Sequence, residues 1–198
     1  MTTFVPSASE EGLVYTYRPS LMGAPWQFKL DELGIAWSVG GHSGRVAFRD
    51  VRRVRMSYKP VSMQPTRFLT ELWADGAPKL EIVSSTWKSM IQQERLDDAY
   101  SAFIRELHRR LARTAAPVRY ECGTAPFKYW VGFAMFVVLM VGFAILAIPA
   151  LQSGFQAGAL TAVMFFILFG WQVGRFFLRN RPGVYRADAP PEALLPKG

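Results

Sequence analysis

The twelve residues FRDVRRVRMSYK, at positions 48–59, concentrate side chains that bind anions. Five cations stand among apolar residues here, and together we call them the basic stretch: Arg49, Arg52, Arg53, Arg55 and Lys59. From Val54 to Tyr58 every second residue is apolar, which predicts a strand with one face in a core. The other face then carries Arg53, Arg55 and Lys59. Guanidinium and ammonium groups gathered on one face bind phosphates and carboxylates.

Nucleic acid is a poor ligand for the basic stretch. Residues 1–127 carry 17 basic and 13 acidic groups, a net charge of only +4, and no nucleic-acid-binding motif accompanies the cations. An anionic lipid head group or an acidic partner fits better, because a cation beside an anionic cytoplasmic leaflet gains about 1 kcal/mol. A solvated outer strand face is the third interpretation.

Residues suited to catalysis or metal binding are sparse. The chain has two histidines, His42 and His108, and one cysteine, Cys122. None of them stands in a cluster of Cys, His or carboxylates with the spacing of metal ligands. We therefore predict no catalytic residues, no metal site and no cofactor.

The composition divides the chain into a polar part and an apolar part. Hydrophobic residues make up 51% of the 198 positions and charged residues 19%, which is too apolar for an ordinary soluble domain. No Asp, Glu, Lys or Arg occurs from Tyr129 to Gly174, a run of 46 residues. About 20 helical residues cross a bilayer, and PALQSGFQAG at 149–158 interrupts the run. We therefore predict a two-helix transmembrane hairpin over 128–178, with spans at 129–150 and 157–178.

The flanking charges orient this hairpin. Lys and Arg stand on both of its outer sides and are absent from the turn, which places both termini in the cytoplasm. The start, MTTFVPSASEEG, lacks a secretory signal, and a single cysteine is typical of a reducing compartment. We expect a bacterial inner-membrane protein with two spans. The residues expected at the membrane interface are Tyr129, Trp130, Trp171, Arg175 and Arg179.

Small residues recur at helical spacing within the hairpin. Gly154 and Gly158 form one small-xxx-small pattern, and Gly170 and Gly174 form a second. Such patterns let membrane helices approach closely. Gln172 lies inside the second span and offers an amide for hydrogen bonding. These residues pack the two helices together or receive a second chain.

The polar part is expected to be mostly β-structure followed by one helix. Residues 13–87 read as about seven short strands separated by turn signals, a spacing typical of a small sandwich or barrel. In the following segment, an apolar stripe recurs at intervals of four, three, four and four residues: Leu96, Tyr100, Phe103, Leu107 and Leu111. We expect this helix to cover an open end of the strands. An interfacial helix lying on the membrane is the alternative.

The segment FKLDELGIAWSVGGHSGRVAFRDVRRVRM resembles the bacterial pleckstrin-homology-like (PH-like) domains that are fused to membrane spans. The shared features are a strand, a DELG turn, a second strand, a glycine turn, and an apolar strand running into RDVRRV. The resemblance covers roughly residues 13–114 and implies a barrel of about seven strands capped by a helix. In many of those proteins the membrane spans precede the domain, whereas here they follow it.

The expected fold class is α+β plus membrane. We predict a tail at 1–12, a PH-like domain at 13–114, a linker at 115–127, the hairpin at 128–178 and a proline-rich cytoplasmic tail at 179–198. The tail contains APPEALLP, a composition suited to a groove of its own domain or of a partner. A disordered tail is the other interpretation.

The favoured function is a non-catalytic accessory, assembly or scaffold subunit of a larger membrane complex. Its partners would be the lipid bilayer and other membrane subunits or a second copy, with no nucleic acid. The alternative is a membrane-tethered module that binds anionic lipid head groups through the basic stretch. A membrane enzyme or small transporter is the third hypothesis, and the uncharged spans count against it.

Overall fold

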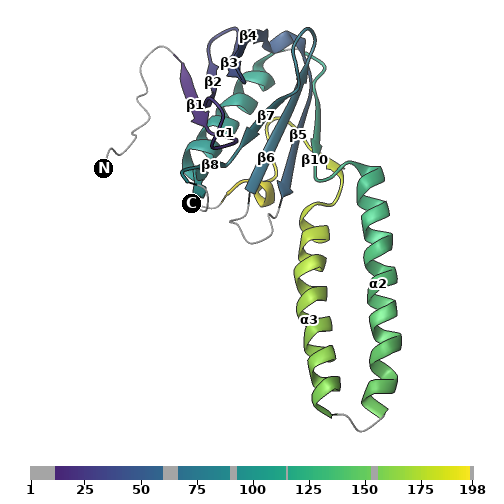
Figure 1. Ribbon diagram of the computed structural model, residues 1–198. Coiled ribbons are helices and arrows are strands. Elements are labelled where there is room, and N and C mark those ends of the chain that lie inside the picture. Colours follow the sequence, from purple (N-terminus) through teal and green to yellow (C-terminus); the bar gives the residue numbers. More distant parts are fainter. Residues whose placement is uncertain (1–11, 60–66, 90–92, 115, 153–155, 197–198) are drawn as a thin grey trace. The chain divides into compact units, whose positions relative to one another are not determined.

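A computed structural model describes residues 12–59, 67–89, 93–114, 116–152 and 156–196 (Figure 1). The fold is α+β, with strands in several sheets and three α-helices. The chain divides into two compact units. One unit contains the described residues up to Cys122 together with those from Gly183 onward, and the other contains Gly123–Pro182. The polar unit is therefore built from segments on both sides of the hairpin.

A four-stranded antiparallel meander forms the first sheet of the polar unit. Its strands are β1 (Leu13–Tyr17), β2 (Trp26–Leu30), β3 (Gly34–Val39) and β4 (His42–Ala47). Gly40 and Gly41 connect β3 to β4 with φ angles of 57° and 83°, as a two-residue type I′ turn requires. The register places Phe28 opposite both Tyr15 and Trp37. This face of the sheet enters the core.

The second sheet is five-stranded and has the order β11-β10-β5-β6-β7. Its strands are β5 (Val51–Lys59), β6 (Arg67–Ala74), β7 (Leu80–Val83), β10 (Arg119–Cys122) and β11 (Gly183–Val184). A short 3-10 turn, η1 (Phe48–Asp50), leads from β4 into β5. β10 runs parallel to β5, and the other pairs are antiparallel. β8 (Ser85–Trp87) and β9 (Gln93–Arg95) form a separate two-stranded sheet.

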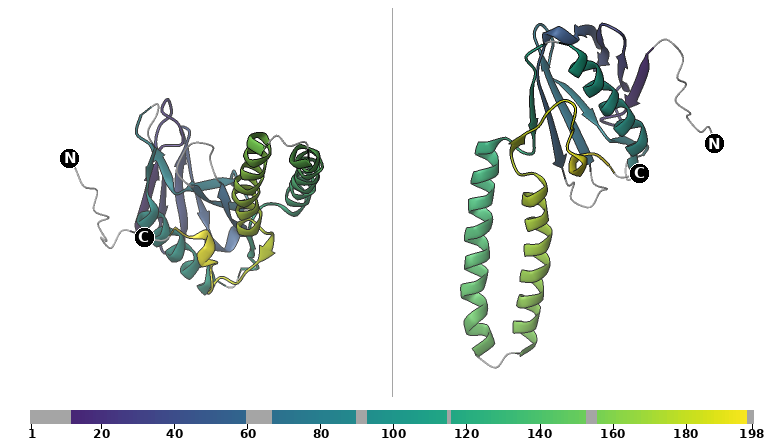
Figure 2. Two further views of the ribbon diagram at one scale, coloured as in Figure 1. Left: turned by 90° about the horizontal axis from the view of Figure 1, so that it is seen from below. Right: turned by 180° about the vertical axis from the view of Figure 1, so that it is seen from behind.

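The predicted helix is α1 (Asp97–Arg113), which Figures 1 and 2 show packed against the strands. Four of the five residues of its apolar stripe are buried, as the spacing predicts, and the fifth, Leu96, is half-buried just before the helix. The Phe103 ring lies 5.5 Å from the Tyr15 ring of the first sheet. The Tyr100 hydroxyl lies 2.7 Å from the Thr70 hydroxyl of the second sheet. Contacts on both sides show that α1 joins the two sheets through one core.

Tyrosine hydroxyls connect the sheets at the edge of β7. Tyr15 donates to the Val83 carbonyl and Tyr17 to the Glu81 carbonyl, each over 2.5 Å. Burial raises the pKa of both tyrosines, so both hydroxyls remain protonated donors. Within the described residues no backbone ladder links the two larger sheets. Of the two predicted architectures, a sandwich or a barrel, a closed barrel is therefore absent from the described part of the chain. The described part of residues 13–87 forms eight strands, close to the predicted number of about seven. Three further short strands, β9, β10 and β11, follow among the described residues.

Two segments expected to lie outside the domain belong to its sheet and core. The expected linker, 115–127, contains β10, and the expected tail, 179–198, contains β11 and a 3-10 turn, η2 (Glu192–Leu194). Leu194 and Leu195 are only 3% and 2% exposed and join the hydrophobic core. The prediction of a groove in the chain's own domain is therefore the one the structure matches. Burial of two leucines supplies the free energy that orders a proline-rich segment.

The hairpin unit consists of α2 (Pro126–Gln152) and α3 (Gln156–Arg179). Aromatic rings pack between the helices: Phe177 of α3 lies 5.4–5.5 Å from the rings of Tyr129, Phe133 and Phe136 of α2. In the described part of the chain, one helix is long and apolar enough to cross a membrane by length and composition, namely α2 over Pro126–Pro149. The second span remains a prediction.

Candidate functional site

The basic stretch lies in η1 and along β5, and its cations do not form one surface. The register shifts between Val51 and Arg53, so Arg52 occupies an irregular position and is separated from the regular alternation. Val54 and Met56 are fully buried. Arg53, Arg55 and Lys59 therefore share the outer face of the five-stranded sheet, as the two-residue period predicts.

Arg55 is committed to an ion pair within the domain. Its Nε donates to Glu121 Oε2 over 3.0 Å, and its Nη2 contacts the same oxygen. The Arg55 and Glu121 side chains are only 15% and 12% exposed. Arg119 Nε reaches the other oxygen, Oε1, at 2.9 Å. The Glu121 carboxylate thus lies between two guanidinium groups and fastens β10 to β5.

Arg53 stacks on an aromatic ring. Its guanidinium carbon lies 3.8 Å from the ring centroid of Trp73, which is its cross-strand partner on β6. Arg55 and Lys79 approach the same ring at 5.5 and 6.0 Å. Cations over an indole face are attracted by the ring's electrons. Trp73 is therefore the centre of a small cationic cluster on the outer sheet face.

The remaining cations of the basic stretch are more exposed. Arg52 Nε donates to Asp75 over 2.7 Å. Arg49 has a side chain that is 83% exposed and a contact of 3.8 Å to Asp50, its sequence neighbour. Lys59 is exposed at the end of β5. Arg49 and Lys59 are consequently the two cations best able to meet a ligand from outside.

The local sequence does not mark the partners of the basic stretch. Glu121, Trp73 and Asp75 are distant from it along the chain, and nothing in their local pattern marks them as partners. Asp75 stands in the segment ADGAP, which connects β6 to β7. Only the strand order brings these three residues to the arginines.

His108 is buried and satisfied by two hydrogen bonds. Its Nδ1 lies 2.7 Å from the Ile104 carbonyl and therefore donates, while Nε2 lies 2.8 Å from the Tyr185 hydroxyl and accepts. The rings of Tyr120 and Tyr185 pack around the imidazole. Burial lowers the pKa of His108. The histidine thus holds the segment after the hairpin against α1.

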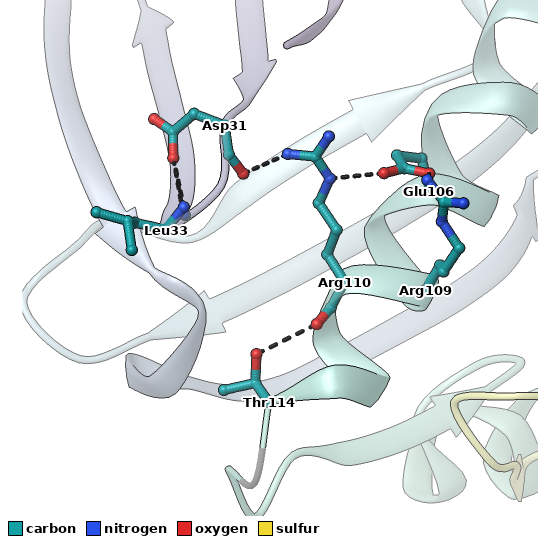
Figure 3. Close-up of polar contacts among 7 residues, drawn as sticks. Asp31, Leu33, Glu106, Arg109, Arg110 and Thr114 are labelled. Carbon is teal, nitrogen blue, oxygen red and sulfur yellow. Dashed lines mark hydrogen bonds and ion pairs between the residues drawn. The ribbon is translucent and has the colours of Figure 1, made fainter.

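The acidic residues Glu106 of α1 and Asp31 of the turn between β2 and β3 also have structural roles (Figure 3). Arg110 Nε donates to Glu106 over 2.6 Å, and Arg110 also reaches the Asp31 carbonyl in the turn between β2 and β3. The Asp31 carboxylate accepts the Leu33 amide at 3.0 Å. Among the described residues no group of three or more His, Cys, Asp or Glu is placed to hold a metal ion.

The comparisons with known proteins identify no relative. No protein-family model, no curated protein and no solved structure matches the chain. The resemblance to PH-like domains therefore rests on the sequence pattern alone.

The predicted packing residues of the hairpin have different environments. A Cβ added at Gly170 would lie 3.0 Å from Met140 Cε, so this glycine allows α2 to approach. A Cβ at Gly174 would meet nothing within 4 Å, and Gln172 is exposed. Gly154 and the surroundings of Gly158 lie outside the described residues. In the part of the hairpin that the structure describes, the helices pack through phenylalanine rings and at Gly170.

The predicted interface residues also differ in exposure. Tyr129 is buried among aromatic rings of the hairpin, whereas Trp130 and Trp171 are exposed. The Arg175 guanidinium carbon lies 5.7 Å from the Trp171 ring, and Arg179 ends α3. An exposed indole beside a cation is the side-chain pair expected at a membrane surface.

Proposed function

We propose that this protein is a non-catalytic accessory or scaffold subunit of a larger membrane complex. It would be anchored in the bacterial inner membrane by a two-span hairpin, with both termini and the α+β domain in the cytoplasm. Its surfaces would hold partner subunits at the membrane.

The observation that carries this proposal is the way the chain enters and leaves the hairpin. The chain leaves the sheet after Cys122 of β10 and returns at Gly183 of β11, and these residues are paired partners. The domain is thus attached to the hairpin through two adjacent strands. A domain that is held by two covalent connections suits a scaffold, whereas a freely tethered module needs only one connection.

Apolar exposure along the hairpin supports a membrane environment. Exposed side chains occur on both helices and include Met135, Val138, Ile167 and Leu168. Exposed apolar patches of this extent are unfavourable in water. α3 has no Asp, Glu, Lys or Arg from Gln156 to Gly174, which supports it as the second span.

The roles of the polar side chains support a non-catalytic function. His108, Glu121 and Glu106 each bind side chains or backbone groups of the fold. A general acid or base must instead reach a substrate. These residues stabilise the domain, and partner binding remains as the function for its exposed surfaces.

Affinity purification of the full-length protein from its native membrane tests this proposal. After a salt wash, mass spectrometry should identify a membrane protein in stoichiometric amount. A protein that is recovered with no other protein from gently solubilised membranes would contradict the proposal.

A second candidate function is binding of an anionic lipid head group. The exposure of Arg49 and Lys59 favours it. In native mass spectrometry of the full chain with an anionic phospholipid, R49E/K59E should retain at least fivefold less lipid than the wild type. R186E is the matched control, because Arg186 is equally exposed but lies outside the basic stretch. Equal lipid retention by R49E/K59E and the wild type would exclude this function.

A further inference from the structure

The two larger sheets end in four edges, at β1, β4, β7 and β11, and contacts within the chain cover two of them. At β7, the hydroxyls of Tyr15 and Tyr17 donate to the carbonyls of Val83 and Glu81 and so occupy the position of a partner strand. Beside β1, the Trp87 amide of β8 donates to the Arg18 carbonyl over 3.2 Å. The β11 edge is only two residues long. The six-residue strand β4 is the remaining edge, and its first four residues are exposed.

The turn into β4 decides which of its backbone groups face outward. Val39 and His42 flank the two-residue glycine turn and therefore form a hydrogen-bonded pair. Along an antiparallel ladder, hydrogen-bonded and non-hydrogen-bonded pairs alternate. Gly44 and its partner Trp37 thus bond to each other, whereas Ser43 and Arg45 direct their amides and carbonyls away from β3. An open row of such groups is a template for a further strand.

We propose that β4 pairs antiparallel with β4 of a second copy, around a two-fold axis at Gly44. In this register Ser43 lies opposite the second copy's Arg45, and Arg45 opposite the second copy's Ser43. Both pairs use the outward backbone groups identified above, so the edge is complementary to itself. The two Arg45 side chains are not opposite each other, and each is paired with Asp31 of its own chain.

An unpaired indole at the same place supports this interface. Trp37 Nε1 is buried without a hydrogen-bond partner within the described part of the chain. The indole lies against β4, since a Cβ added at Gly44 would be 2.7 Å from Trp37 Cζ2. Pairing around Gly44 places the second copy's β4 beside this indole. The interface therefore covers a tryptophan that is only half-buried in the single chain.

A proline at position 43 tests the interface without disturbing the β3–β4 ladder. Ser43→Pro removes an outward amide, and proline is tolerated on an edge strand whose N–H faces solvent. By light scattering in detergent, the wild type should have the protein mass of a dimer. Ser43→Pro should raise the dissociation constant at least tenfold, whereas the matched Ser43→Ala should leave it unchanged. A monomeric wild type, or a Ser43→Pro variant that dimerises like Ser43→Ala, would overturn the proposal.

Cross-linking tests the register. Two differently tagged full-length chains, S43C/C122S and R45C/C122S, are co-expressed and treated with a short thiol cross-linker. The mixed dimer should cross-link several times more than S43C/C122S alone, because only the mixed pair places two cysteines opposite each other. Equal yields in both samples would refute pairing around Gly44. Neither test depends on a partner protein, so the failure of either test leaves the scaffold proposal intact.

Discussion

Arg55 and Glu121 lie 66 positions apart in the chain and form a half-buried ion pair between β5 and β10. The chain between them contains β6, β7 and the whole of α1. Glu121 stands immediately before the hairpin, so this pair anchors the strand through which the chain leaves the domain. Arg55, a cation of the basic stretch, thus stabilises the fold through an ion pair within the domain.

Neutralising Glu121 should destabilise the domain. Glu121→Gln leaves the guanidinium of Arg55 without its charged acceptor in a poorly solvated position, and we expect a loss of about 2 kcal/mol in the free energy of unfolding. Thermal unfolding in detergent, followed by tryptophan fluorescence, measures the change. Asp188→Asn is the control, since its ion pair with Arg186 is exposed and should contribute little. Equal midpoints for the two variants would argue against the role of the pair.

Truncating Leu195 should loosen the C-terminal segment. Leu195→Ala removes buried apolar groups from the core, which typically costs about 2–5 kcal/mol. We expect a lower unfolding midpoint and faster proteolysis after Arg186. Glu192 lies in the same turn but is exposed, so the unfolding midpoint of Glu192→Ala should match that of the wild type. If Leu195→Ala also matches the wild type, the leucine does not belong to the core.

Acid should destabilise the domain through His108. Burial holds its pKa below the ordinary value, so the unfolded chain takes up this proton at a higher pH than the folded protein does. The free energy of unfolding therefore falls as the pH decreases below about 6.5. The unfolding midpoint should be lower at pH 5.5 than at pH 7.5, and His108→Gln should reduce this difference.

Tyr185→Phe separates the titration of His108 from its hydrogen bond. This variant keeps the imidazole but loses the hydroxyl that donates to Nε2. It should be less stable than the wild type at both pH values and should retain the pH dependence. A His108→Gln variant with the same pH dependence as the wild type would show that another group takes up the proton.

Gly123 should tolerate no side chain. Its φ angle is 76°, and an added Cβ would lie 2.4 Å from the carbonyl oxygens of Asn180 and Arg181. Gly123→Ala should therefore cost more than about 1 kcal/mol and lower the thermal midpoint. Gly23→Ala is the matched control, because a Cβ there meets nothing within 4 Å. Equal midpoints for both variants would contradict the close approach at Gly123.

Local patterns in the sequence were sufficient for several elements. The apolar alternation from Val54 to Tyr58 predicted the strand β5 and its buried positions. The apolar stripe from Leu96 to Leu111 predicted α1. The uncharged run predicted the apolar helix α2. Each of these features follows from periodicity or hydropathy within one short segment, where neighbours in sequence are also neighbours in space.

Only the tertiary structure decided what the arginines contact and where the chain ends pack. Glu121 and Leu195 stand in segments whose proline and glycine content predicts a linker and a tail, yet the first joins the sheet and the second the core. Their place depends on strand register and burial against residues far away in the chain. Such contacts form because separate segments fill one core and pair along one sheet, and neither condition leaves a periodic signal in the local sequence.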